Sequence, residues 1–159
     1  MGIEDQHPSD HPCSRTTIPA RHKRSIAERK HRVDTHQKAP TSDITRFHPG
    51  PRYCEATVHN GTAYLAGQVA DDGSQDIRGQ TAQVLAAIDR LLAEVGSDRS
   101  RILMAQIHLA DLADYDGMNA VWDTWVPHGH APPRATVQSR LARPEWRIEI
   151  VVTAAVMAA

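Results

Sequence analysis

Lysine is missing from most of this chain, and cysteine is scarce. All three lysines, Lys23, Lys30 and Lys38, lie before residue 43, so residues 43–159 contain none. This excludes a Schiff-base lysine and a phosphate-loop lysine from that part of the chain. The two cysteines, Cys13 and Cys54, form no CxxC pair. We therefore expect neither a disulfide framework nor a zinc knuckle.

Long apolar runs are also absent. No run of apolar residues is long enough to span a bilayer, and the N-terminus lacks the apolar core of a secretory signal. We expect a soluble, cytoplasmic protein with no membrane partner.

Charge is unevenly distributed along the sequence. Residues 1–42 carry eight Lys or Arg against five acids, whereas residues 43–159 carry ten Arg against fourteen acids. Because nucleic-acid binding needs a basic surface, the acidic balance of the second part predicts no nucleic-acid partner. A total of 159 residues allows one ordinary domain with a sizeable core.

Residues 1–42 read as a disordered extension that is rich in His and Arg. They contain almost no large apolar residues, so they cannot bury enough surface to offset the entropy cost of ordering. His7, His11 and Cys13 resemble a loose metal-ligand set, but no fourth ligand or compact loop accompanies them. We interpret them as isolated residues of a disordered tail and expect no metal site.

Residues 43–159 are predicted to form one α+β domain, with elements in the order β-β-β-α-β-α-β-β. An Asn60-Gly61 turn joins two extended runs, which is a strong hairpin signal. An apolar stripe at helical spacing predicts a helix from about Asp76 to Val95, with Gly96 as its C-terminal cap. A second helix, capped by Asp111 or Asp114, is predicted to end near Val126. The strands are predicted at 44–48, 53–58, 62–69, 101–109, 133–138 and 146–152.

The last two strands are predicted to form an antiparallel hairpin, because a short connection joins them. In that arrangement Arg134 lies directly across from Glu149, close enough for the two charges to meet. Apolar residues surround Glu149 in sequence, so its carboxylate is costly unless it is paired or used. The pair would be either a structural ion pair that fixes register or a functional one.

The two amphipathic helices are predicted to cover one face of a mixed sheet. The other face would carry Val137, Val151 and Ala155 and would be too apolar to face water, as is typical of an interface. We therefore expect an obligate oligomer.

Several short motifs occur in order between about Ile44 and Val156. They are Gly50-Pro51 with Tyr53, Gly67-Gln68, Gln80-Thr81, Asp111-Leu112 with Asn119, Pro132-Pro133-Arg134, and Ile148-Glu149-Ile150. Together these motifs resemble the RidA-type reactive intermediate deaminases. The resemblance implies a chorismate-mutase-like fold, a homotrimer whose sheets pack around a central barrel, and a ligand cleft at each subunit boundary.

The resemblance also implies roles for single residues. Arg134 would grip the substrate carboxylate, and Glu149 would orient or activate water. The expected substrate-binding residues are Tyr53, Gly67, Asn119 and Thr136. Two departures from the family pattern are the extra Arg52 before Tyr53, and the Ala66 and Thr136 that stand where many members have serine and cysteine. His108, His128 and His130 are interpreted as structural or solvated residues, and Trp122 and Trp125 as core aromatics.

The activity that this resemblance implies is cofactor-independent hydrolysis of 2-imino or enamine acids, such as 2-iminobutanoate and 2-iminopropanoate, to 2-oxo acids and ammonia. The alternative is a non-catalytic trimer that binds small carboxylates or a partner protein in the same cleft. Family members have also been linked with RNA cleavage, which the acidic, lysine-free domain disfavours.

Overall fold

The computed structural model describes residues 43–157. The predicted disorder of residues 1–42, and the His7, His11 and Cys13 set, lie outside the described residues. No helix within residues 43–157 combines the length and the apolar character that crossing a membrane would need.

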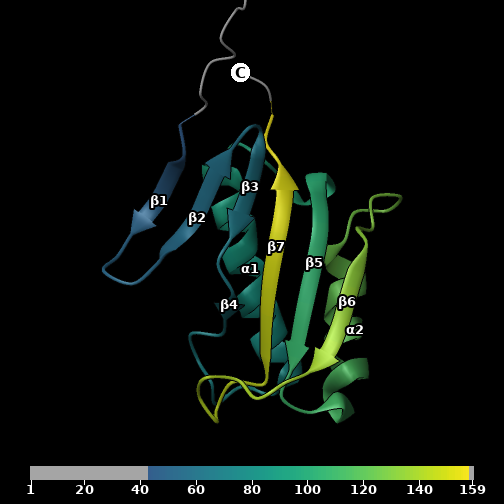
Figure 1. Ribbon diagram of the computed structural model, residues 1–159. Coiled ribbons are helices and arrows are strands. Elements are labelled where there is room, and N and C mark those ends of the chain that lie inside the picture. The colour runs from purple at the N-terminus through teal and green to yellow at the C-terminus, as the bar shows by residue number, and fades with distance from the viewer. Residues whose placement is uncertain (1–42, 158–159) are drawn as a thin grey trace, which may run out of the picture. The chain divides into compact units, whose positions relative to one another are not determined.

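One mixed sheet of seven strands forms the centre of the domain (Figure 1). Its strand order is β1-β2-β3-β7-β5-β6, and the short β4 also pairs with β7. Only β5 and β6 run parallel, while the other pairs are antiparallel. The strands are β1 (Thr45–Pro49), β2 (Cys54–His59), β3 (Thr62–Leu65), β4 (Gln68–Val69), β5 (Ile102–Leu109), β6 (Arg134–Gln138) and β7 (Ile148–Ala155).

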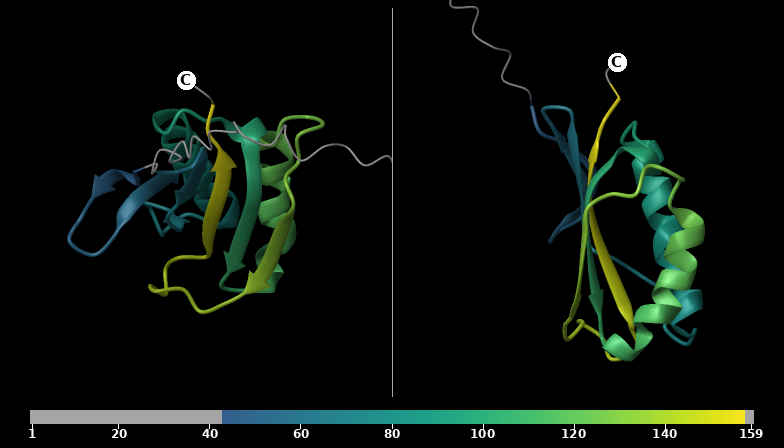
Figure 2. Two further views of the ribbon diagram at one scale, coloured as in Figure 1. Left: turned by 45° about the horizontal axis from the view of Figure 1, so that its top comes forward. Right: turned by 90° about the vertical axis from the view of Figure 1, so that its right-hand side faces the viewer.

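Two helices, α1 (Ile77–Glu94) and α2 (Tyr115–Trp125), pack on the same face of the sheet (Figure 2). The Asp76 side chain caps α1 by accepting from the N–H of Gly79, and Gly96 follows the helix with a φ of +74°. Asp111 caps the short 3-10 turn η3 (Leu112–Asp114) before α2, whereas Asp114 caps neither. The α+β fold with two helices on one face is confirmed.

The predicted hairpin between β6 and β7 is wrong. β5 lies between them and pairs with both, in parallel with β6 and antiparallel with β7. Arg134 is level with Ala105 of β5, and Glu149 is level with His108. Two strand spacings and three residues of strand length therefore separate Arg134 from Glu149, which is about 14 Å between Cα atoms.

The core lies between the sheet and the helices. Val84, Ile88 and Leu92 of α1 are fully buried, as are Ile107 of β5 and Ile150 of β7. Successive β7 side chains alternate between buried and half-buried, because neighbouring residues of a strand point to opposite faces. Ile148 and Ile150 therefore face the helices, and Glu149 between them faces away.

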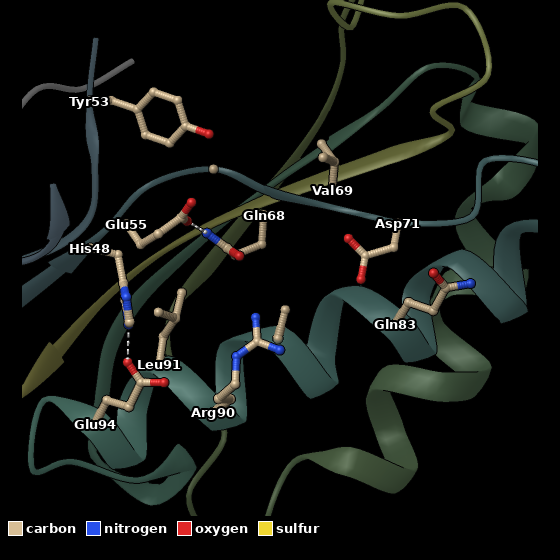
Figure 3. Close-up of a pocket in the computed structure, with 12 residues that line it drawn as sticks. His48, Tyr53, Glu55, Gln68, Val69, Asp71, Gln83, Arg90, Leu91 and Glu94 are labelled. Atoms are coloured by element: carbon tan, nitrogen blue, oxygen red, sulfur yellow. Dashed lines mark hydrogen bonds and ion pairs between the residues drawn. The ribbon is translucent and has the colours of Figure 1, made fainter. Parts of the chain in front are cut away.

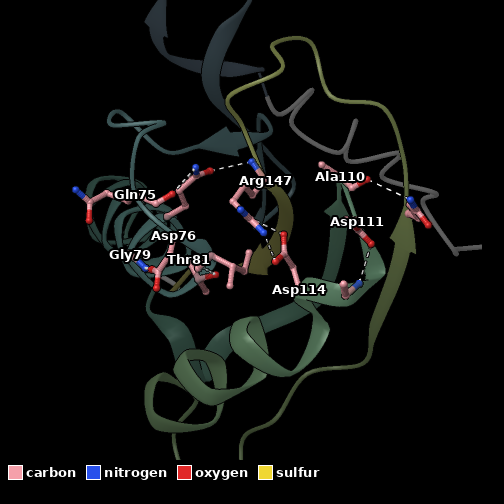
Figure 4. Close-up of polar contacts among 12 residues, drawn as sticks. Gln75, Asp76, Gly79, Thr81, Ala110, Asp111, Asp114 and Arg147 are labelled. Carbon is pink, nitrogen blue, oxygen red and sulfur yellow. Dashed lines mark hydrogen bonds and ion pairs between the residues drawn. The ribbon is translucent and has the colours of Figure 1, made fainter.

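A buried polar cluster fixes the start of β7 (Figure 4). Gln80 of α1 is fully buried, and its side-chain N–H groups donate to the carbonyls of Gly73, Gln75 and Glu145 at 2.9–3.1 Å. Its carbonyl oxygen accepts from the N–H of Arg147 at 2.8 Å. The cluster therefore ties α1 to the segment that positions Glu149 two residues later.

The Arg147 side chain extends this cluster to α2. Its guanidinium forms a bidentate pair with the buried Asp114 carboxylate, at 2.9 and 2.5 Å. Hydrogen bonding to that carboxylate raises the pKa of Arg147. Asp114 is thus used to hold α2 against the start of β7 rather than to cap the helix.

The sheet face opposite the helices has no layer over it within residues 43–157 (Figure 2). Tyr64 of β3 is 52% exposed and Val137 of β6 is 47% exposed. Val151 and Ala155 of β7 are half-buried, in strand positions that alternate with core residues. We call this surface, formed by Tyr64, Val137, Val151, Thr153, Gln106, His108 and Glu149, the open face.

Candidate functional site

Arg134 begins β6 and turns its side chain toward α2. Its guanidinium donates to the Asn119 side-chain oxygen at 2.7 Å and to the Tyr115 hydroxyl at 3.4 Å. The guanidinium carbon lies 5.3 Å from the centre of the Trp122 ring, which is within range of a cation–π interaction. Arg134, Asn119 and Thr136 form what we call the arginine half.

The arginine half contains a positive charge that no acid neutralises. No carboxylate of residues 43–157 lies within ion-pair distance of Arg134. A guanidinium carries five N–H donors, and Asn119 and Tyr115 leave part of that set unused. A planar fork with free donors and no acid partner is suited to binding a carboxylate through two parallel hydrogen bonds.

Thr136, two residues after Arg134 on the same side of β6, has an unusual hydroxyl. Its oxygen is buried and has no hydrogen-bond partner within the described residues. Most buried polar groups are paired, and each exception needs an explanation. A ligand group, or a second copy of the chain, is able to supply the missing hydrogen-bond partner.

Glu149 and Gly67 form a second group, which with Tyr53 we call the glutamate half. A Cβ atom built on Gly67 would lie 1.9 Å from Oε1 of Glu149, so only glycine lets the carboxylate rest on the backbone between β3 and β4. The side chain of Glu149 has no hydrogen bond or ion pair with any residue of 43–157. Its carboxylate is therefore free to accept from water or a ligand.

A cavity of about 630 Å³ borders Gly67 and Tyr53, between β4 and α1 (Figure 3). Tyr53 is 66% exposed and lies at one end of the labelled group, across from the α1 residues. Among the lining residues His48 bonds Glu94 at 2.5 Å, and Gln68 donates to Glu55 at 3.2 Å. The glutamate half therefore adjoins a space that can hold a small molecule.

The two halves do not meet within one protomer. Arg134 faces the helix layer, whereas Glu149 faces the open side of the sheet. With about 14 Å between their Cα atoms, no rotamer of either side chain brings the charges into contact. The expectation that a single hairpin joins them is overturned, and one protomer by itself contains no complete site with both groups.

The structure brings one further ionisable group to the glutamate half. His108 of β5 is the Cα partner of Glu149 on β7, so both side chains emerge on the open face about 5 Å apart at Cβ. The sequence predicts a strand at His108 and a structural or solvated role for it. His108 lies beside Glu149 only because β5 pairs with β7, and the local alternation of apolar residues does not specify which strands pair.

No group of three or more His, Cys, Asp or Glu side chains within residues 43–157 is arranged to hold a metal ion. His128 and His130 lie in the exposed loop before β6. Trp125 donates its indole N–H to Asp89, while Trp122 is buried and also packs against Arg134.

Comparison with known proteins identifies clear relatives. Residues 44–156 match the family model described as Endoribonuclease L-PSP. A RutC family protein of Haemophilus ducreyi is 52% identical over 113 residues, which cover 71% of this chain and 97% of the relative. The RutC family protein YoaB of Escherichia coli is 44% identical over 113 residues, covering 71% and 98%.

Solved structures of similar proteins have the same fold. A YjgF family protein from Neisseria meningitidis superposes with a TM-score of 0.73 and is 50% identical, covering 75% of this chain and 99% of that one. Yeast Mmf1, at 22% identity, has a TM-score of 0.68 and covers 72% and 100%. This second similarity concerns the fold alone.

Proposed function

Since this chain belongs to the YjgF/RidA family, we propose that it hydrolyses reactive 2-imino and enamine acids to 2-oxo acids and ammonia. The proposal rests mainly on the surroundings of Arg134. Its guanidinium is held between Asn119 and Trp122, with no acid partner in residues 43–157. This is the arrangement that a small carboxylate substrate would complete.

Each step of the reaction has a group suited to it. Arg134 holds the carboxylate next to the C=N bond and draws electron density from the imine carbon. Glu149 positions a water molecule and takes one of its protons as the new C–O bond forms. Glu149 gives that proton to the nitrogen, which forms a carbinolamine. The carbinolamine hydroxyl then passes its own proton through Glu149 to the nitrogen, the C–O bond becomes C=O as the C–N bond breaks, and ammonia leaves a 2-oxo acid. An imine is already electrophilic, so the proposed reaction needs no metal or organic cofactor.

The separation of the two halves supports an active site shared between copies of the chain. A homotrimer, with the open faces packed around a chorismate-mutase-like barrel, would cover the open face. It would also bring the arginine half of one copy to the glutamate half of its neighbour. Thr136 supports the same arrangement, because its buried hydroxyl lacks a partner within the described part of one protomer.

The direct test compares Arg134→Gln with the parent for ammonia and 2-oxobutanoate release from 2-iminobutanoate generated by a dehydratase. We expect a loss of about a hundredfold or more in kcat/KM, because the amide cannot supply two charged hydrogen bonds. Arg46→Gln, at an exposed position of β1, is the matched control and should keep the parent rate. An Arg134→Gln protein as fast as the parent would refute the assignment.

Mixing two inactive variants tests the shared site. Arg134→Gln retains the glutamate half, and Glu149→Gln retains the arginine half. Co-assembled in equal amounts, they should regain about one quarter of the parent activity, since one boundary in four pairs two intact halves in a closed ring. Absence of any regained activity in confirmed mixed assemblies would contradict a site shared between copies.

A non-catalytic role is the competing outcome. A parent protein that binds 2-oxobutanoate through Arg134, but does not accelerate ammonia release above the uncatalysed background, would be a small-carboxylate binder with the same fold.

A further inference from the structure

His48 of β1 reaches α1 through an unusual backbone conformation. Its φ is +49°, a left-handed conformation that costs free energy for a residue with a Cβ atom. Phe47 packs against the core between the sheet and the helices, so a fully extended His48 would point to the opposite face. The left-handed φ breaks that alternation, and Nε2 of His48 lies 2.5 Å from Oε2 of Glu94 on α1 (Figure 3).

Glu94, the partner of His48, is also in a locally unfavourable place. It is the last residue of α1, where the helix dipole disfavours a negative charge. The last turn of α1 contains no basic residue that would offset this charge. Two unfavourable local choices therefore meet in one contact, and such conflicts between local preference and the fold are typical of functional positions.

The His48–Glu94 contact fixes the end of β1 that leads to Tyr53. Within residues 43–157, β1 is an edge strand that pairs only with β2. The turn at residues 50–52 joins the two strands, and the N–H of Gly50 donates to the carbonyl of Tyr53 at 2.8 Å. The side chain of Tyr53 is 66% exposed, so its placement depends on how the hairpin of β1 and β2 is held.

His48, Glu94 and Tyr53 line the same space. All three border the cavity of about 630 Å³ beside Gly67. His48 and Tyr53 also border a second cavity of about 410 Å³ against the turn at residues 50–52. Since empty space adjoins this turn, the contact to α1 is the anchor that keeps Tyr53 at the wall of the larger cavity.

We propose that His48 and Glu94 are positioning residues that hold Tyr53 in place beside the glutamate half. This inference rests on the proposed hydrolysis, in which Tyr53 is a substrate-binding residue, and it assigns a role to two residues outside the predicted site. Without the contact, the edge strand is free to move away from α1 and carries Tyr53 with it. Substrate then binds more weakly, whereas the chemical step at Arg134 and Glu149 is unchanged.

The kinetic test removes the contact and keeps the backbone conformation. His48→Asn tolerates a left-handed φ, but its side chain is too short to reach Glu94. We expect KM for 2-iminobutanoate to rise about three- to tenfold while kcat stays within about twofold of the parent. Glu94→Ala should give the same change, whereas Glu94→Gln still hydrogen-bonds the imidazole and should keep KM near the parent value. Arg78→Ala, at an exposed position of α1 outside the cavity, is the matched control and should keep the parent KM.

Thermal unfolding separates positioning from a merely structural role. His48→Gly loses the contact but relieves the left-handed strain, and Glu94→Ala removes a charge that the helix dipole opposes. Both variants should therefore unfold at a temperature close to that of the parent, although KM rises. A fall in the melting temperature that accompanies the rise in KM in both variants would count against the proposal.

A spectroscopic measurement follows Tyr53 without using activity. The chain contains three tyrosines, Tyr53, Tyr64 and Tyr115, so protein labelled with 3-fluorotyrosine gives three fluorine NMR signals. The Tyr53→Phe variant identifies the signal of Tyr53. We expect His48→Asn and Glu94→Ala to shift this signal and to leave the other two in place.

The outcomes separate this inference from the proposed function. An unchanged Tyr53 signal and an unchanged KM in His48→Asn, beside an inactive Arg134→Gln protein, would overturn the positioning role alone. Parent activity in Arg134→Gln would instead overturn the proposed hydrolysis. In that case the fluorine signal still decides whether the His48–Glu94 contact places Tyr53.

Discussion

A single methyl group at Gly67 should remove most of the activity while leaving the fold intact. The Cβ of alanine at this position would lie 1.9 Å from Oε1, 2.8 Å from Cδ and 3.1 Å from Cγ of Glu149. Unbonded heavy atoms settle at about 3.5 Å or more, so the carboxylate must move by more than about 1 Å. Gly67 is not among the residues with positive φ, so its backbone accepts alanine.

Gly67→Ala should affect activity and stability differently. Misplacing a reacting group by about 1 Å costs about a hundredfold in rate, or about 2.7 kcal/mol in the activation barrier. A glycine replaced by alanine in a compatible conformation gains about 0.4–1 kcal/mol of stability, which offsets part of the steric cost. We therefore expect a large fall in kcat/KM with a melting temperature close to that of the parent.

Activity on 2-iminobutanoate, measured beside thermal unfolding, checks this prediction. The double variant Gly67→Ala/Glu149→Gln supplies the internal control. If the methyl group acts only by displacing the carboxylate, the double variant should be no slower than Glu149→Gln. A Gly67→Ala enzyme with the parent rate, or a double variant in which the two losses add fully, would refute this reasoning.

Three other predictions concern the scaffold. Gln80→Leu should cost about 3 kcal/mol in urea unfolding, because it leaves buried N–H and C=O groups unpaired. Gly117→Ala should lower the free energy of unfolding by about 1 kcal/mol, since its Cβ would lie 2.6 Å from Ile77 Cγ2 and overpacking outweighs the gain in helix propensity. In an Ile77→Ala background the same change should leave the free energy of unfolding unchanged or raise it. Hydrogen bonds from Ser74 and Gln75 lower the pKa of Asp72 from its ordinary value. Ser74→Ala should therefore raise the Asp72 pKa, which an NMR titration measures. With the folded pKa lowered, these bonds contribute above about pH 4 and are lost as the pH falls through the folded pKa.

Local features of the fold could be predicted from the sequence because their causes are local. The apolar stripe of α1, its Asp76 cap and the positive φ of Gly96 all follow from neighbours within one or two turns. The existence of β6 and β7 also follows from their composition. Their pairing does not, because α2 connects β5 to β6 as a parallel crossover and leaves β5 between two strands that are consecutive in sequence.

The candidate site could be predicted only in part from the sequence, for the same reason. Tyr115, Asn119 and Trp122 occupy positions i, i+4 and i+7 of α2, so they share one helix face, but nothing in that spacing shows which strand the face covers. The structure places β6 there and brings Arg134 onto these three side chains. Likewise His108 becomes a neighbour of Glu149 only through the β5–β7 register.

Each half of the proposed site is organised before any second copy arrives. Trp122 and Asn119 fix the guanidinium of Arg134, while the polar cluster around Gln80 fixes the start of β7 and hence Glu149. Groups held in place beforehand lose little conformational entropy when substrate binds. Assembly would then have to supply only the relative placement of two rigid halves, so a substitution at the boundary that leaves both halves unchanged should alter activity in proportion to the population of assembled protein.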